Sequence, residues 1–149
     1  MLNGIDPLLT GDLLAALDAM GHGDCVVLAD AHFPAARLAT RALAYPAVGT
    51  PDLLRAVGTV LPLDDPPAVD LMATADGGVV DVQRALVEAA GQSLGTVRFL
   101  ERFEFYREAG SAFVVVRTGE TRSYGNVLVR KGVVGAVPAS RIAGSEGAT

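Results

Sequence analysis

Several residue types that define other protein classes are scarce in this chain of 149 residues. It has one cysteine, Cys25, which cannot form an intrachain disulfide. Because Cys25 lies in an apolar run, we expect it to be a small buried hydrophobe. Charged residues make up only 19%, the net charge is −5, and the twelve Lys and Arg are scattered instead of forming a basic stripe. A basic face is what holds a phosphate backbone, so nucleic acid is not an expected partner.

Long apolar stretches are also missing. No uninterrupted apolar run approaches the roughly 20 residues of a membrane-spanning helix, and residues 1–7 lack the charged and apolar regions of a signal peptide. These absences favour a cytoplasmic protein that does not contact membranes. Apolar residues nevertheless make up 50% of the chain, so we expect one core and some apolar surface between subunits.

The only two histidines lie in one short stretch, GHGDCVVLADAHFP at 21–34. Its potential metal ligands are His22, Asp24, Asp30 and His32. Their spacing lacks the i, i+4 pairing of zinc proteases, and no further His or Cys pair completes a site, so no metal is predicted. The glycines at 21 and 23 follow a predicted helix, whereas a dinucleotide fingerprint follows a strand. We therefore expect no cofactor at this loop.

Helical and strand patterns alternate along the chain. Apolar spacing and caps predict helices over 13–20, 50–60, 79–90 and 100–108, and apolar or β-branched runs predict strands over 25–29, 69–74, 112–116 and 126–129. The non-alternating run 25–29 is typical of a strand covered on both faces. The pattern predicts an α/β fold, with a mixed, mostly parallel sheet and helices packed on both faces.

Three details complete this prediction. The last two strands are expected to pair as neighbours, and the Ala-rich segment 37–48 offers no strong pattern. Residues 1–137 are expected to form a single domain, and residues 138–149, which lack periodicity, a flexible tail.

His22 and Asp30 are the first candidates for chemistry. Ligands of open α/β sheets bind outside the carboxyl ends of the strands, where Asp30 is expected, but His22 precedes the same strand. A five-residue strand spans about 17 Å, so the two side chains cannot touch along it. Either the loop of His22 folds back or the two meet from different subunits. Taken by itself, His22 fits a helix-end or hydrogen-bonding role better than a catalytic one, because the carbonyl end of the preceding helix stabilises an imidazolium.

The other polar candidates each have a simpler interpretation. Tyr124, Gly125 and Asn126 offer donors and acceptors suited to sugar hydroxyls, but also fit an ordinary turn. Arg102 fits a surface ion pair on its helix. His32 stands beside a carboxylate that can orient an imidazole, or satisfies backbone groups in a loop.

Taken together in chain order, these segments resemble one family. They are GHGD (21–24), DAHFP (30–34), RF and FY (102–103 and 105–106), GE (119–120) and YGN (124–126). The set, spread over residues 1–134, is similar to that of the family of ribose pyranases and fucose mutarotases (RbsD/FucU).

This resemblance implies an RbsD-like domain that interconverts the α and β anomers of a free monosaccharide without metal or organic cofactor. By the same resemblance His22 is the proton donor, and Asp30, Arg102, Tyr124, Gly125 and Asn126 bind the sugar. A homo-oligomer, commonly a decameric ring with sites near subunit contacts, is also implied.

The choice of sugar depends on two positions. Pyranase relatives carry His where this chain has Arg102, and usually Ala where it has Gly125, so the resemblance favours L-fucose. D-ribose pyranase activity stays an alternative. Another alternative is a non-catalytic sugar-binding or transport-associated subunit that holds a sugar with the same residues.

Overall fold

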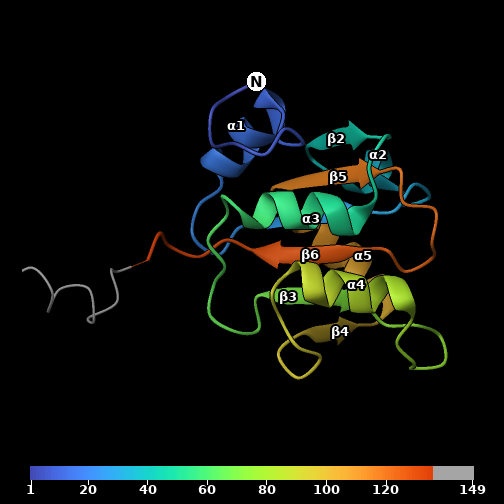
Figure 1. The fold of residues 1–149 in the computed structure, drawn as a ribbon. Helices are drawn as coiled ribbons and strands as arrows, with labels where there is room; N and C mark the ends of the chain where they lie inside the picture. Colours follow the sequence, from blue (N-terminus) through green and yellow to red (C-terminus); the bar gives the residue numbers. More distant parts are fainter. Residues whose placement is uncertain (136–149) are drawn as a thin grey trace, which may run out of the picture.

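A six-stranded sheet forms the centre of the part of the protein that the computed structural model describes, residues 1–135 (Figure 1). Its strands are β1 (Cys25–Ala29), β2 (Ala42–Tyr45), β3 (Val69–Met72), β4 (Arg98–Leu100), β5 (Val114–Thr118) and β6 (Val127–Arg130). They lie in the order β2-β5-β1-β6-β3-β4. β6 runs antiparallel to its neighbours β1 and β3, while the other pairings of this sheet are parallel. The predicted mixed, mostly parallel sheet is therefore confirmed.

Helices cover both faces of the sheet. α1 (Gly11–Ala19), α3 (Thr50–Gly58) and α4 (Asp81–Ala89) pack on one face, and α2 (Ala35–Leu38) and α5 (Arg102–Ser111) on the other. In Figure 1, α3 and α4 lie in front of the strands and α5 behind them. Among residues 1–135, no helix is long and apolar enough to cross a membrane.

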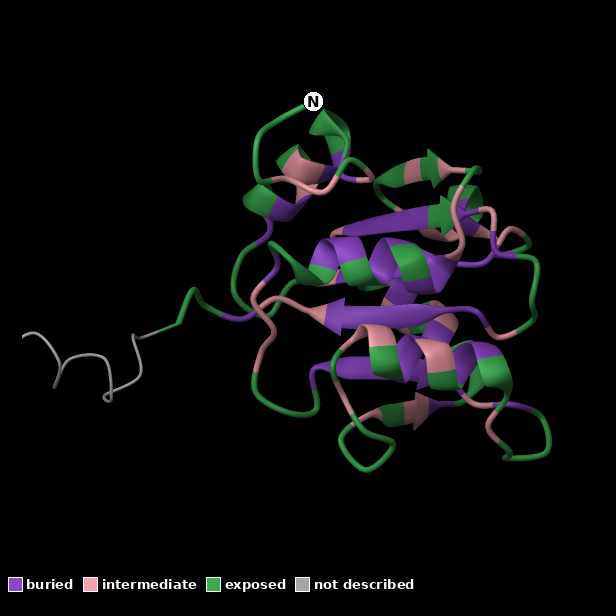
Figure 2. Cartoon of the chain, in the orientation of Figure 1, coloured by how far each residue is buried: buried purple, intermediate pink, exposed green. Residues whose placement is uncertain are grey.

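β1 shows why its sequence does not alternate. Val26 and Leu28 pack with α1, α3 and α4, whereas Val27 and Ala29 pack with α2 and α5. All four side chains are fully buried, as the purple central strands of Figure 2 illustrate. A strand between two helical layers needs apolar residues on both faces, and this is the pattern that the sequence has.

The predicted pairing of the last two strands is wrong. β5 and β6 do not pair with each other, because each pairs with β1 from the opposite side. The connecting residues 119–126 instead cross the carboxyl end of β1, where the Ala31 amide donates to the carbonyl of Glu120 at 2.8 Å. This crossing brings the connection to the functional end of the sheet.

Other differences concern short elements and boundaries. α2, β2 and β4 were not predicted, because these short elements bury at most one residue each, whereas the equally short β3 and β6 are mostly buried and carry an apolar pattern. α5 begins at Arg102 and not at residue 100, since the Glu101 carboxylate caps it by accepting from the amides of Phe103 and Glu104. The predicted tail, 138–149, and the domain boundary at 137 lie outside the described residues.

Candidate functional site

A polar hollow of about 300 Å³ opens at the carboxyl ends of β1 and β3. Because β6 runs antiparallel between these two strands, its amino end reaches the same edge of the sheet. The lining residues are Asp30, His32 and Phe33 after β1, Met72 of β3, Arg102 and Tyr106 of α5, and Ser123, Tyr124 and Asn126 before β6. Four of the six predicted site residues therefore meet here: Asp30, Arg102, Tyr124 and Asn126.

Asp30 and Asn126 form the buried floor of the hollow. The Asp30 amide donates to Oδ1 of Asn126 at 2.8 Å, and Nδ2 of Asn126 donates to Oδ2 of Asp30 at 2.9 Å. The other carboxylate oxygen, Oδ1 of Asp30, accepts from the His32 amide at 2.9 Å. The two side chains are only 7% and 2% exposed. Paired in this way, the Asp30 carboxylate has a fixed orientation and keeps lone pairs that can accept from a ligand hydroxyl.

Arg102 forms one wall and is held by aromatic rings. Its Nε donates to the Tyr106 hydroxyl at 3.2 Å, and its guanidinium lies 5.4 Å from the Tyr106 ring centroid and 5.7 Å from that of Phe103. The hydrogen bond to Tyr106 is the main reason that the pKa of Arg102 is raised above its usual value. Tyr106 in turn packs edge-on against Phe33, with 5.4 Å between centroids. The Arg102 guanidinium is thus held by Tyr106, which is itself fixed by its packing against the buried Phe33.

Tyr124 reaches the hollow from a left-handed backbone conformation, with φ of 65°. Its hydroxyl accepts from the Ala75 amide at 3.4 Å. The next residue, Gly125, does not line the hollow, contrary to the expectation that it binds ligand. It is buried behind the wall, where a Cβ atom would lie only 2.6 Å from Cγ of Glu120. Gly125 thus allows the chain to pack closely against Glu120.

His22 lies at the other end of β1 and is not part of this hollow. Its side chain is 61% exposed, and Nε2 donates to Oδ1 of Asp64 at 3.1 Å. That hydrogen bond is the main cause that lowers the pKa of Asp64. The loop of His22 does not fold back toward Asp30, so within one copy the strand keeps the two apart by about 17 Å.

Sequence reasoning missed part of the site. Phe33, Met72, Tyr106 and Ser123 line the hollow but were not predicted to do so, and His32, left without a role, lies in its wall. The aromatic spacing of Phe103 and Tyr106 on one helix was visible in the sequence. What it does there depends on the rotation of α5 about its axis, which only packing decides. Asp64 carried no signal beyond a polar turn.

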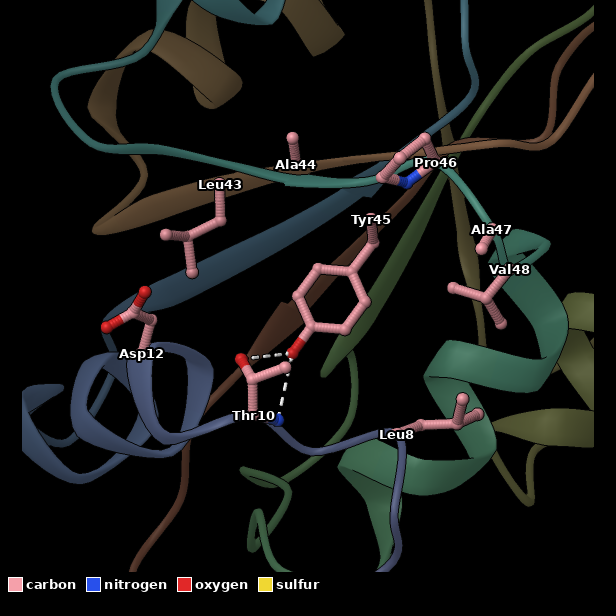
Figure 3. A pocket seen from close by; sticks show the side chains of 9 residues that line it. All are labelled: Leu8, Thr10, Asp12, Leu43, Ala44, Tyr45, Pro46, Ala47 and Val48. Atoms are coloured by element: carbon pink, nitrogen blue, oxygen red, sulfur yellow. Dashed lines mark hydrogen bonds between the residues drawn. The ribbon is translucent and has the colours of Figure 1, made fainter.

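A second hollow, of about 400 Å³, lies beside the edge strand β2 (Figure 3). It is lined largely by apolar side chains such as Leu8, Leu43 and Val48. The Tyr45 hydroxyl in its wall is already hydrogen-bonded to the amide and hydroxyl of Thr10. Across residues 1–135, no group of three or more His, Cys, Asp or Glu side chains is placed to hold a metal ion. The first hollow, with its polar lining, is therefore the candidate site.

Comparison with known proteins assigns the chain to a family. The profile of the RbsD / FucU transport protein family matches residues 3–134. The chain belongs to this family. A fucose mutarotase of Homo sapiens is 42% identical to it, over 92% of this chain and 97% of the human protein. An L-fucose mutarotase of Actinobacillus pleuropneumoniae is 36% identical, over 89% of this chain and 97% of that protein.

A solved structure with bound sugar has the same fold. The fucose mutarotase of Streptococcus pneumoniae in complex with L-fucose superposes with a TM-score of 0.82 at 34% identity, and the match covers 90% of this chain and 100% of that one. The resemblance to the RbsD/FucU family that the sequence segments indicated is thus confirmed. Of the two arrangements that the sequence left open for His22, the one in which its loop folds back toward Asp30 is not found, because His22 pairs with Asp64 at the other end of β1.

Proposed function

We propose that the protein is a sugar mutarotase that interconverts the α and β anomers of a free monosaccharide, with L-fucose as its substrate. The observation that carries the proposal is the hollow in which Asp30 and Asn126 orient each other opposite Arg102. This set suits a ligand that has hydroxyl groups and no charge, because carboxylate and amide oxygens accept while the guanidinium and amide donate. The similarity of this chain to a human fucose mutarotase, at 42% identity, supports the same reaction.

The reaction needs only proton transfers. His22 protonates the ring oxygen while the anomeric hydroxyl loses its proton to a water molecule, which opens the ring to the aldehyde; the aldehyde rotates, and the ring closes with the two proton transfers reversed. In the proposed complex Asp30 and Asn126 bind sugar hydroxyls, Arg102 donates to a hydroxyl or to the ring oxygen, and Tyr124 completes the polar wall. His22 is the proton donor. Positioned acid–base catalysis contributes about 10²- to 10⁴-fold, and the reaction uses no metal or organic cofactor.

His22 reaches this site from a neighbouring copy of the chain. Within one copy it lies at the opposite end of β1, and its side chain, although hydrogen-bonded to Asp64, is 61% exposed and so accessible to a neighbouring copy. We propose that copies assemble into a ring, with a decamer as the expected size, in which each site combines two copies. The protein is expected to act in the cytoplasm.

The reaction is tested by saturation-transfer NMR on equilibrated L-fucose. The protein should speed the exchange between the α and β anomer signals, and D-ribose and D-galactose measured alongside rank the sugars. Accelerated D-ribose exchange without L-fucose exchange would assign pyranase activity instead. If no sugar exchanges faster although the protein is folded, the mutarotase proposal is wrong.

The shared site is tested by mixing two impaired variants. His22→Ala removes the proton donor and Asp30→Ala removes the carboxylate that binds the sugar, so each variant alone should keep only a small residual activity. After subunits have exchanged, a mixed oligomer contains some sites with an intact His22 and an intact Asp30, and activity should rise well above the residual level. Activity that stays at the residual level although mass spectrometry shows mixed oligomers would refute a site made by two copies.

The separation of His22 from the hollow also favours a second candidate function, a sugar-binding subunit without turnover. This candidate predicts that L-fucose binds, as calorimetry would detect, and that its anomers exchange at the uncatalysed rate. In that case His22→Ala would change nothing, whereas Asn126→Ala would weaken binding.

A further inference from the structure

The loop that carries His22 is held in one shape by its own residues. The Gly21 amide donates to Oδ2 of Asp24 at 2.7 Å, and the Asp24 amide donates back to the Gly21 carbonyl at 3.1 Å. Gly23 adopts a φ of +85°, which closes the turn and which other residues rarely adopt. The orientation of this loop relative to the rest of the protein depends on contacts with other segments.

The backbone around Lys131 lies between the loop of His22 and the segment of Asp64. On one side the Gly23 amide donates to the Lys131 carbonyl at 2.8 Å, and the Lys131 amide donates to the Asp24 carbonyl at 2.9 Å. On the other side Lys131 forms an isolated β-bridge with Leu63. The hydrogen bond between His22 and Asp64 therefore reaches across a segment that has Lys131 at its centre.

Gly132, the next residue, allows this segment to lie close to residues 62–63. The Gly132 amide donates to the Pro62 carbonyl at 2.8 Å, and a Cβ on Gly132 would clash with the Leu63 carbonyl oxygen. No larger side chain fits here without moving the segment that carries Asp64.

The Lys131 side chain also holds the helix that leads into the same loop. Its Nζ donates to the carbonyls of Leu17 at 2.7 Å, Met20 at 2.7 Å and Asp18 at 3.3 Å, at the end of α1. The last carbonyls of a helix have no partner within it and carry the negative end of its dipole. α1 has no basic residue of its own in its last turn, so Lys131 supplies this charge from a distant part of the chain.

The residue type fits this position. Lys131 is the only lysine of the chain, whose other strongly basic residues are all arginines. An ammonium group is compact and has three donors, which suits three carbonyls around one point. A planar guanidinium presents its donors in a fork and does not match them.

We infer that Lys131 is a positioning residue for the proton donor, because it holds His22 at both ends of its loop: through the end of α1 and through the backbone shared with Asp64. This inference rests on the proposed function. Lys131 does not touch the sugar; it sets where the His22 imidazole is presented to the neighbouring site.

The test is a Lys131→Met variant, which keeps the aliphatic stem and removes the ammonium. A misplacement of about 1 Å can cost 10²-fold in rate, so we expect anomer exchange to fall by about 10- to 100-fold. Affinity for L-fucose should stay within about threefold, since the hollow is at the other end of the sheet. The matched control is Arg55→Met, which removes the exposed cation in the last turn of α3, where it pairs only with Asp52. It should leave both quantities unchanged.

A double-mutant cycle separates positioning from a general loss of structure. In a His22→Ala background, Lys131→Met should cost no further activity, because its effect passes through the imidazole. As a second signature, the pKa of Asp64, followed by ¹³C NMR, should rise toward its ordinary value in Lys131→Met, since the hydrogen bond from His22 lowers it in the intact protein.

The outcomes are distinct. Full exchange activity in folded Lys131→Met, or an equal loss with and without His22, would overturn the inference. If Lys131→Met fails to fold, Lys131→Arg keeps the charge and the backbone contacts, and it should lose exchange activity; full activity there would overturn the inference too. Failure of the proposed function is a different result, because then the unaltered protein does not accelerate exchange.

Discussion

Replacing Asn126 by aspartate tests the reciprocal pairing at the floor of the site. The two side chains have nearly the same shape, but the change puts a carboxylate oxygen where Nδ2 now donates to Oδ2 of Asp30 at 2.9 Å. Two charges with centres about 4 Å apart repel by on the order of 4 kcal/mol at an effective dielectric constant of 20. At 1.36 kcal/mol per pKa unit, this raises the apparent pKa of the pair by roughly 3 units, so one of the two carboxyls takes up a proton near neutral pH.

The sign of the effect on stability follows from this proton. Because the folded pair has a raised pKa, the folded state binds more protons than the unfolded state between about pH 4 and pH 7. The variant should thus be close to the unaltered protein near pH 4 and lose about 4 kcal/mol relative to it as the pH rises to 8. The assay is urea unfolding at a series of pH values.

The matched control for this change is Asn3→Asp, which adds the same charge at an exposed position. It should show no pH-dependent loss. If Asn126→Asp keeps the stability of the unaltered protein at pH 8, the paired geometry of Asp30 and Asn126 is wrong.

Three further predictions concern the walls of the site. Gly125→Ala should destabilise the fold by about 1–3 kcal/mol in urea unfolding, because the new Cβ would lie 2.6 Å from Cγ of Glu120; an unchanged midpoint would contradict this packing. Tyr106→Phe removes the hydroxyl that accepts from Arg102. L-fucose binding measured by calorimetry should weaken about 3- to 10-fold, as expected for the loss of a hydrogen bond with a net contribution of about 1 kcal/mol. An unchanged Kd would contradict this role of Tyr106. The hydrogen bonds from Arg122 lower the pKa of Glu120, so the ion pair stabilises the fold fully above the ordinary pKa of 4.5, and this stabilisation is lost as the pH falls through the lower pKa of the folded state. Glu120→Gln should therefore make Tm fall less steeply toward acid pH. An identical pH profile of Tm in the variant would argue against the ion pair.

Local chemistry was enough to predict the long elements. The run 25–29 is apolar at every position, which suits a short strand that is covered on both faces. α1 is capped by Thr10, whose hydroxyl accepts from the Leu13 amide. The position of Asp30 at the carboxyl end of this strand follows directly from the end of the apolar run at residue 29.

Pairing and close approach were not predictable in the same way. Strands 114–118 and 127–130 follow each other in the sequence, so a hairpin was the natural expectation, yet both gain more by covering the two edges of the apolar strand β1. β2 and β4 lie at the edges of the sheet and are largely exposed, so they carry no apolar pattern; they form because the neighbouring strands offer them hydrogen-bond partners.

The candidate site divides along the same line. The residue types proposed to bind a sugar, and the order in which they occur, could be found from the sequence alone, because carboxylate, guanidinium, hydroxyl and amide groups keep their donor and acceptor character wherever they lie. Only the tertiary structure decided which of them meet. It brought Asp30 and Asn126 together across 96 residues, turned Gly125 away from the hollow, and placed His22 beside Asp64 at the far end of the strand. Such distances depend on how whole elements pack, and no local stretch of sequence contains that information.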